Sequence, residues 1–244
     1  MQPEISVGVE NYEYLTLPSN GIGFQELKEL HVRPMTMKEE KMLGNKSLVK
    51  AGKLQEEIFK ACVSKGIDKA GNKIPGEAID WKRLLMEDEY ALLIFIRAIS
   101  YGTDYEPELT CPVCGKKQTV IINFETDLPV TYADDNIEAE FKVTLPKSGK
   151  RVTLRLPERR DSENDIWKMV ENCIVELEGT DPTLLHMVVQ NLIAQDVAVM
   201  RKAVNESKFG VTKEIIYHCG NNECPTEGEP QELALPLTQD FFRI

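Results

Sequence analysis

Apolar residues recur along the chain with two different spacings, and each spacing predicts a different kind of element. Helical spacing begins after residue 35, where Thr36 and Glu39 form a capping box at the start of a predicted helix over 37–52. The longest apolar stripe runs through 81–102, "WKRLLMEDEYALLIFIRAISYG", with Asp80 as its expected N-cap. This second pattern predicts the central buried helix of the fold.

The segment between these two helices also has helical spacing. Leu54, Ile58 and Cys62 share one face of a predicted helix, and Gly66 is its expected end. Cys62 lies among apolar residues, as does Cys173 farther along the chain, so both are expected to be buried core thiols.

Alternation with a period of two appears between residues 141 and 156. Two runs of alternating apolar residues flank a turn at Gly149 and predict a β-hairpin; they are Phe141, Val143 and Leu145, then Val152, Leu154 and Leu156. Strand-like sequence also surrounds two cysteine pairs, over 107–124 and over 211–235. Helical patterns return at 161–176, 182–192 and 194–207, with Asp181 capping a helix that begins at Pro182.

The order of helices, strands, helices and strands predicts an α+β fold rather than a regular series of βαβ units. We expect four regions: an extended arm with turns over 1–35, a helical region over 36–106, a β-rich metal-knuckle region made of 107–157 plus 209–244, and a helical insertion over 158–208.

Composition narrows the class of protein. The 244 residues are 42% hydrophobic and 28% charged, which is typical of globular proteins, and no apolar run approaches the roughly 18 residues of a membrane span. The formal net charge of −11 weighs against nucleic-acid binding because an acidic surface repels phosphate. The polar, acidic N-terminal sequence does not resemble a secretory signal, so we expect a reducing compartment and few disulfides.

The two cysteine pairs carry the clearest chemistry. "LTCPVCGKKQ" contains Cys111 and Cys114, and "HCGNNECP" contains Cys219 and Cys224. Each pair spans a tight turn between strand-like residues, so the two turns together resemble the knuckles of a zinc ribbon. Four thiolates would close a tetrahedral site with no position left for a catalytic water, which predicts a structural Zn²⁺. The sequence does not distinguish zinc from iron.

Other interpretations of these cysteines stay open. The pairs could be free thiols, and His218 could replace one sulfur as a ligand. A thiol oxidoreductase is a further alternative, although a redox C-x-x-C usually opens a helix and strand-like residues follow Cys114 here. No catalytic motif was found, and the carboxylates in "EDEY" and "ERRDSEND" are expected to be solvated.

Several stretches occur in an order that resembles a known family: "LTLPSNGIGF", "HVRPMTMKEEKML", "IRAISYG", "YEPELTCPVCGK" and "VTLPKSGKRVTLRLPERRDS". They are similar to the baseplate hub and hub-assembly proteins of T4-like contractile-tailed bacteriophages, over roughly residues 15–163. Cys111 and Cys114 map directly onto this resemblance, whereas the C-x4-C spacing of the second pair departs from it.

The resemblance implies a non-enzymatic structural or assembly protein of the phage tail baseplate. Its expected partners are other baseplate and hub proteins in a symmetric multi-protein assembly. No membrane partner is expected, and the net charge of −11 weighs against nucleic acid. Its expected locations are the virion tail and, during assembly, the host cytoplasm. Contact elements are expected in the arm over 1–14, in "LPSNGIGF" and in the C-terminal "FFRI". The alternative function is a zinc-ribbon adaptor that binds nucleic acid or the transcription machinery.

Overall fold

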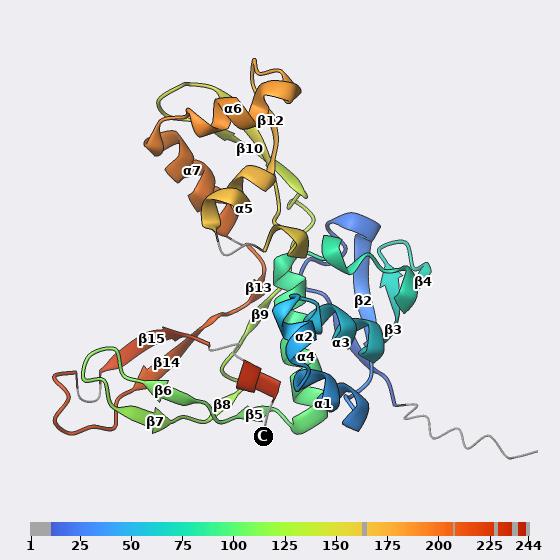
Figure 1. Cartoon of the computed structure of the whole chain (residues 1–244), viewed down its shortest axis with the longest axis vertical. Coiled ribbons are helices and arrows are strands. Elements are labelled where there is room, and N and C mark those ends of the chain that lie inside the picture. The colour runs from blue at the N-terminus through green and yellow to red at the C-terminus, as the bar shows by residue number, and fades with distance from the viewer. Residues whose placement is uncertain (1–10, 163–164, 207, 227–228, 236–238, 243–244) are drawn as a thin grey trace, which may run out of the picture.

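The computed structural model describes residues 11–162, 165–206, 208–226, 229–235 and 239–242. Figure 1 shows a central body, an upper lobe and a β-arm that extends to the lower left. Helices are combined with several small antiparallel sheets, so the predicted α+β class is confirmed. Among the described residues no individual helix has both the length and the apolar composition of a membrane span; only a bent pair, 182–190 with 194–205, meets that test jointly.

The body contains a four-stranded antiparallel sheet in the order β1-β2-β3-β4. Its strands are β1 (Glu13–Thr16), β2 (Leu27–Val32), β3 (Val63–Asp68) and β4 (Lys73–Pro75). The body helices are α1 (Met37–Leu43), α2 (Lys46–Lys50), α3 (Leu54–Cys62) and the central α4 (Met86–Tyr101). Short 3-10 turns, η1 (Phe24–Glu26), η2 (Gly76–Ala78) and η3 (Trp81–Arg83), connect them.

The predicted capping box is present at the start of α1. Thr36 accepts a hydrogen bond from the backbone of Lys38, and the Glu39 carboxylate accepts from the backbone N–H of Thr36. Burial opposes ionisation of Glu39, but hydrogen bonds from Arg33 and Thr36 outweigh it and lower its pKa to about 2. The cap therefore also anchors α1 to the end of β2.

Predicted helix bounds in the body were wrong at three places. The helix predicted over 37–52 is interrupted after Leu43, where Gly44 ends α1 and Asn45 caps α2. The other two differ because tertiary pairing overrides local preference. Helix α3 ends at Cys62, and the next residues form β3. Gly66 lies inside that strand, where a Cβ atom would come within 2.5 Å of Leu27 Cδ2, so glycine allows close packing there. Asp80 caps only η3, and α4 begins at Met86, since Leu85 forms a β-bridge with Glu158.

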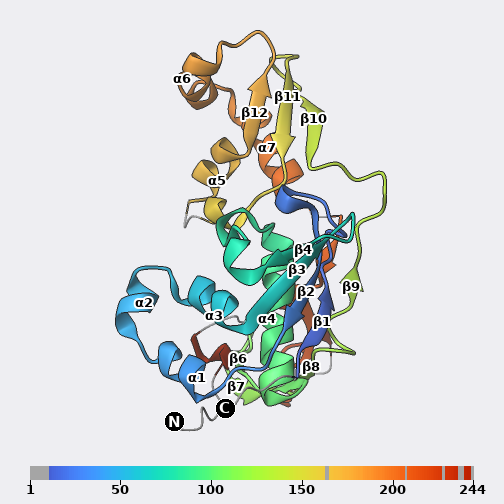
Figure 2. The ribbon, with the colours of Figure 1, turned by 90° about the vertical axis from the view of Figure 1, so that its right-hand side faces the viewer.

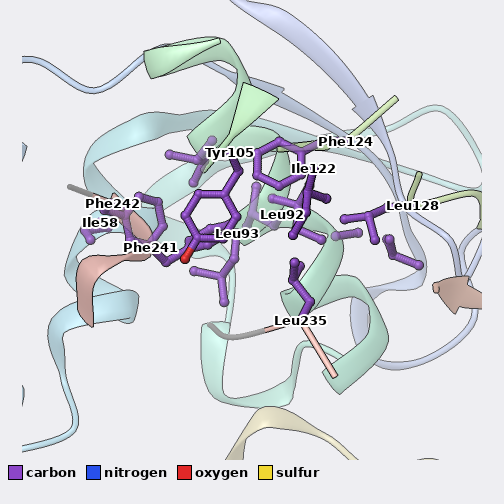
Figure 3. Close-up of a cluster of buried hydrophobic side chains, with 14 of the residues drawn as sticks. Ile58, Leu92, Leu93, Tyr105, Ile122, Phe124, Leu128, Leu235, Phe241 and Phe242 are labelled. Carbon is purple, nitrogen blue, oxygen red and sulfur yellow. The ribbon is translucent and has the colours of Figure 1, made fainter. Parts of the chain in front are cut away.

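The main hydrophobic core surrounds α4. Figure 3 shows Leu92 of this helix among side chains from the middle and the end of the chain. Phe241, in the terminal turn η6 (Gln239–Phe242), packs against the rings of Tyr105 and Phe124, and Arg97 Nε donates to its carbonyl oxygen at 2.9 Å. Phe241 is only 2% exposed, so the expectation that "FFRI" is a contact element was wrong for this ring. Residues 243–244 of that stretch and residues 1–10 of the expected arm lie outside the described residues.

The upper lobe has a core of its own. A sheet of β10 (Glu140–Thr144), β11 (Arg151–Arg155) and β12 (Ile174–Leu177) packs against α5 (Ile166–Asn172), α6 (Leu185–Gln190) and α7 (Ala194–Asn205). The predicted hairpin is confirmed as β10 and β11, and it shares this core rather than that of the cysteine region.

One helix of the upper lobe is shorter than predicted. The pattern over 161–176 predicted a single helix, but α5 ends at Asn172 and β12 follows, because Leu154 and Val152 of β11 pair with Ile174 and Leu177. The Asp181 cap is confirmed, although it begins the 3-10 turn η5 (Pro182–Leu184).

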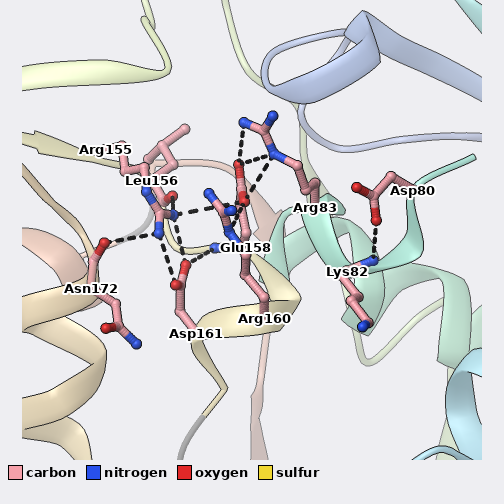
Figure 4. Close-up of polar contacts among 9 residues, drawn as sticks. All are labelled: Asp80, Lys82, Arg83, Arg155, Leu156, Glu158, Arg160, Asp161 and Asn172. Carbon is pink, nitrogen blue, oxygen red and sulfur yellow. Dashed lines mark hydrogen bonds and ion pairs between the residues drawn. The ribbon is translucent and has the colours of Figure 1, made fainter.

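Ion pairs join the upper lobe to the body at η4 (Arg159–Asp161). Arg83 pairs with Glu158 at 3.2 Å, and Arg159 reaches Glu89 of α4 at 2.8 Å. Figure 4 shows Arg155 beside Asp161, which it contacts at 2.7 Å. Glu158, Asp161 and Glu89 are buried, so the expectation of solvated carboxylates was wrong: their neighbouring arginines compensate their charge.

The β-arm consists of short antiparallel pairs. These are β5 (Asp104–Tyr105) with β8 (Ile122–Asn123), β6 (Glu108–Thr110) with β7 (Lys117–Thr119), and β14 (Glu214–His218) with β15 (Pro230–Ala234). A further pair, β9 (Val130–Thr131) with β13 (Gly210–Val211), lies at the base of the arm (Figure 1).

Candidate metal centre

The first cysteine pair lies in the turn between β6 and β7. The Cys111 backbone closes this turn twice, because its N–H donates to Lys116 and its carbonyl accepts from Gly115, both at 2.9 Å. Gly115 has a φ of 71°, a conformation that favours glycine. The reversal brings Cys111 and Cys114 to the same side of the hairpin.

The second pair lies between β14 and β15. Side chains of β14 alternate, so Ile215 and Tyr217 are buried and continue into buried Cys219, whereas His218 is exposed on the other face. The Cys224 N–H donates to the Asn221 carbonyl at 2.8 Å and closes the turn. His218, the alternative ligand, therefore points away from the face that carries the sulfurs.

The structure brings the four predicted sulfurs together. Cys111 Sγ lies 3.9 Å from Cys224 Sγ, and Cys114 Sγ lies 3.7 Å from Cys219 Sγ. All four sulfurs lie within 4.8 Å of one another. With Zn–S bonds of about 2.3 Å, the edge of a regular tetrahedron would be about 3.8 Å. The two close pairs match that edge, so the four side chains could hold one metal ion.

Two amide side chains link the knuckles to each other. The Gln118 amide donates to the His218 carbonyl at 3.0 Å and accepts from the Gly220 N–H at 3.0 Å, so it brackets Cys219 from both sides. Asn221 Nδ2 lies 3.5 Å from Cys114 Sγ. The sequence did not single out either residue for this role, since an amide can serve any donor or acceptor.

Hydrogen bonds shift the pKa values of these thiols. Donation from the Asn221 side chain and the Lys116 backbone lowers the pKa of Cys114 to about 6. Donation from the Cys114 backbone lowers the pKa of Cys111. A bond from the Asn221 backbone N–H acts in the same direction at Cys219, but burial and the neighbouring thiols outweigh it and raise the pKa of Cys219 to about 11. The N–H donors favour thiolate, the form that binds metal.

Burial separates this cluster from the other cysteines. Cys111, Cys219 and Cys224 are at most 4% exposed and Cys114 is half-buried, which restricts solvent access to the sulfurs. Cys62 and Cys173 are fully buried, as predicted, and burial raises the pKa of each to about 12. Neither of these two thiols belongs to the cluster.

Fold and site together define an α+β protein in which two hairpins, far apart in sequence, meet at a four-cysteine cluster. The chain belongs to the T4 bacteriophage base plate protein family, because the family model of that description matches residues 9–243. The resemblance noted from the sequence is thereby confirmed for a T4-like baseplate protein. No curated protein and no solved structure matches the chain at a significant level.

Proposed function

We propose that this chain is a non-enzymatic structural or assembly component of the hub region of a phage tail baseplate. We further propose that Cys111, Cys114, Cys219 and Cys224 bind one structural Zn²⁺. The observation that carries the proposal is the approach of four sulfurs from two hairpins to within 4.8 Å of one another. Membership of the baseplate protein family supports the structural role.

The local geometry favours a structural metal over redox chemistry. Close sulfur contacts join different knuckles, Cys111 to Cys224 at 3.9 Å and Cys114 to Cys219 at 3.7 Å. A thioredoxin-like pair would have its two cysteines at the start of one helix, whereas Cys111 and Cys114 lie in a β-turn. Filling four positions with sulfur leaves none for a reacting water, so the ion would act only by holding the hairpins together.

The partners we propose are other baseplate and hub proteins. The chain would occupy the virion tail as a permanent component, or act in the host cytoplasm as an assembly factor. Detection of the polypeptide in purified, washed tails would identify a permanent component. Absence of co-purification with any baseplate protein, both in tails and in assembly intermediates, would refute the assembly role.

The metal is tested by elemental analysis of the purified protein. We expect about one zinc per chain in the natural sequence and in Cys173→Ala, but almost none in Cys219→Ala. Cys173 is the matched control because it is also a buried free thiol outside the cluster. Iron in place of zinc would correct the metal's identity, and a metal-free natural protein would refute the site.

A further inference from the structure

A groove opens between the first strand of the body sheet and the base of the β-arm. Its walls are β1 on one side and β9 on the other, and Figure 2 shows these two strands side by side. Helix α4 forms the floor through Ile94, Phe95 and Ala98. The cavity measures about 740 Å³, within the range of sites that receive ligands.

Backbone groups of β1 face this groove. Leu17, just beyond β1, donates its N–H to the carbonyl of Lys28 in β2 at 2.8 Å, whereas the carbonyl of the next residue, Pro18, accepts on the opposite side from the Ala133 N–H at 2.8 Å. Backbone groups of successive residues point to opposite sides of a strand. Tyr14 and Thr16 are therefore in phase with Pro18 and present their N–H and C=O groups toward the groove.

The bond between Pro18 and Ala133 also shows where the groove ends. At that point the chain that follows β9 lies at hydrogen-bonding distance from the β1 segment. Farther along, the two strands diverge, and within the described residues β1 has β2 as its only partner strand. The gap thus begins beside this one backbone hydrogen bond and follows the edge of β1 that faces away from β2.

Side chains at the mouth of the groove are apolar and exposed. Tyr14, Tyr132 and Val130 are 64%, 51% and 42% exposed, respectively. Exposed aromatic side chains beside an apolar floor are typical of protein interfaces. The charged residues that line the groove, Glu13 and Glu125, are both acidic.

We propose that this groove accepts an extended segment of another protein, which adds a strand to the free edge of β1. Alternate side chains of the segment are apolar and contact the floor formed by α4, and basic residues near its ends face Glu13 and Glu125. A second copy of this chain fits less well because its net charge of −11 repels the same acidic groove.

The open backbone edge explains why the occupant is extended. A helix satisfies its own backbone groups and would leave those of Tyr14 and Thr16 unused, whereas an added strand pairs with them. This inference rests on the proposed function in one respect only: the segment that adds to β1 is taken to come from another baseplate protein. The groove lies outside the cysteine cluster, so zinc content reports separately on the metal site.

The test uses a labelled seven-residue peptide, KVTITVK, and fluorescence anisotropy with the full chain. Thr16→Pro removes an N–H that faces the groove, and Thr16→Val is the matched control that keeps it. We expect Thr16→Pro to weaken binding about fivefold and Thr16→Val to change it less than twofold. Charge reversal by Glu13→Lys with Glu125→Lys should weaken binding by a similar factor at low salt, and high salt should remove that difference.

Peptide variants provide a measurement that does not depend on the folding of Thr16→Pro. N-methylation of one alternate set of peptide amides should abolish binding, and N-methylation of the other set should be tolerated, because only one edge of an added strand faces β1. Equal effects of the two sets would overturn the proposal, and so would equal binding of the peptide EVTITVE or complete absence of binding.

Two other occupants would also overturn it. Hydrogen exchange of the β1 amides that increases when residues 2–10 are deleted would show that the chain fills its own groove. Self-association that Thr16→Pro abolishes would identify a second copy as the occupant. Zinc content should remain about one per chain in Thr16→Pro, so failure of this inference is distinguishable from failure of the metal site.

Discussion

Replacing Cys219 by alanine is the most direct test of how the two hairpins are held together. Cys219 is 3% exposed, and its sulfur lies 3.7 Å from Cys114 Sγ across the junction of the knuckles. The substitution removes one ligand of the proposed tetrahedron and leaves the other three thiols in place. We expect loss of the metal and a large loss of thermal stability.

The free energy of unfolding that the metal contributes can be obtained in two ways. Cys114 and Cys219 are 105 positions apart, and a permanent cross-link that closes a loop of that order stabilises by about 4.7 kcal/mol. If the unfolded chain instead releases the metal, the ion stabilises by mass action, by about 2.7 kcal/mol at 100 times its Kd and about 4.1 kcal/mol at 1,000 times. Both routes give roughly 3–5 kcal/mol. At about 2–4 °C per kcal/mol for a chain of this size, the Tm should fall by about 10 °C.

The assay is thermal unfolding with and without a strong chelator. The natural protein and Cys173→Ala should both lose stability when the chelator is added, although Cys173→Ala begins from a lower Tm because of its core cavity. Cys219→Ala should not respond to the chelator. A natural protein whose Tm the chelator leaves unchanged, together with an equal zinc content in Cys219→Ala, would refute the reasoning.

Three further predictions concern the body of the protein. Phe241→Ala should lower the free energy of unfolding by about 3–5 kcal/mol in urea unfolding, because its ring is buried. Met187→Ala, at a residue 63% exposed, should lower it by less than about 0.5 kcal/mol. Equal losses in the two variants would contradict the burial of Phe241. Arg159→Ala should cost about 3 kcal/mol in urea unfolding because it leaves the buried Glu89 carboxylate without its partner. The exposed pair of Arg151 and Glu178 serves as the control, because solvent screens it and Arg151→Ala should change the unfolding midpoint much less. Burial raises the pKa of Asp88 to about 7 from 3.8. Between about pH 4 and 7 the folded state therefore binds the proton of this carboxyl more tightly than the unfolded state does. The free energy of unfolding falls as the pH rises through this range. Asp88→Asn should remove on the order of 3 kcal/mol of this decrease between pH 5 and pH 8, measured by urea unfolding at the two values, and parallel pH profiles of the two proteins would contradict the assignment.

Local elements could be predicted from the sequence because their partners are neighbours in the chain. The capping box of α1 joins Thr36 to Glu39, and the hairpin of β10 and β11 turns at Gly149, so a short window of sequence contains each complete motif. Both predictions were confirmed. Such motifs depend on backbone propensity and side-chain spacing, which a single sequence displays directly.

Boundaries that depend on distant partners could not be predicted in this way. The residues after Cys62 continue a helical pattern, yet they form β3 because β2 and β4 pair with them. Likewise Leu85 lies in a continuous apolar stripe but stays extended beside Glu158. The buried carboxylates at this junction have the same cause, since the arginines that compensate them come from other elements.

The C-terminal part of the chain closes onto earlier residues at three places. Strand β13 pairs with β9, the two knuckles meet at their sulfurs, and Phe241 packs beside α4 with its carbonyl bonded to Arg97, 144 positions away. No short window contains both sides of any of these contacts. Only the knuckles could be anticipated, because cysteine carries a chemical signature at both ends, whereas an apolar side chain or a backbone group does not. Since the cysteines Cys111, Cys219 and Cys224 belong to the same continuous core as Phe241, the metal site and the buried C-terminal turn should stabilise one cooperative unit.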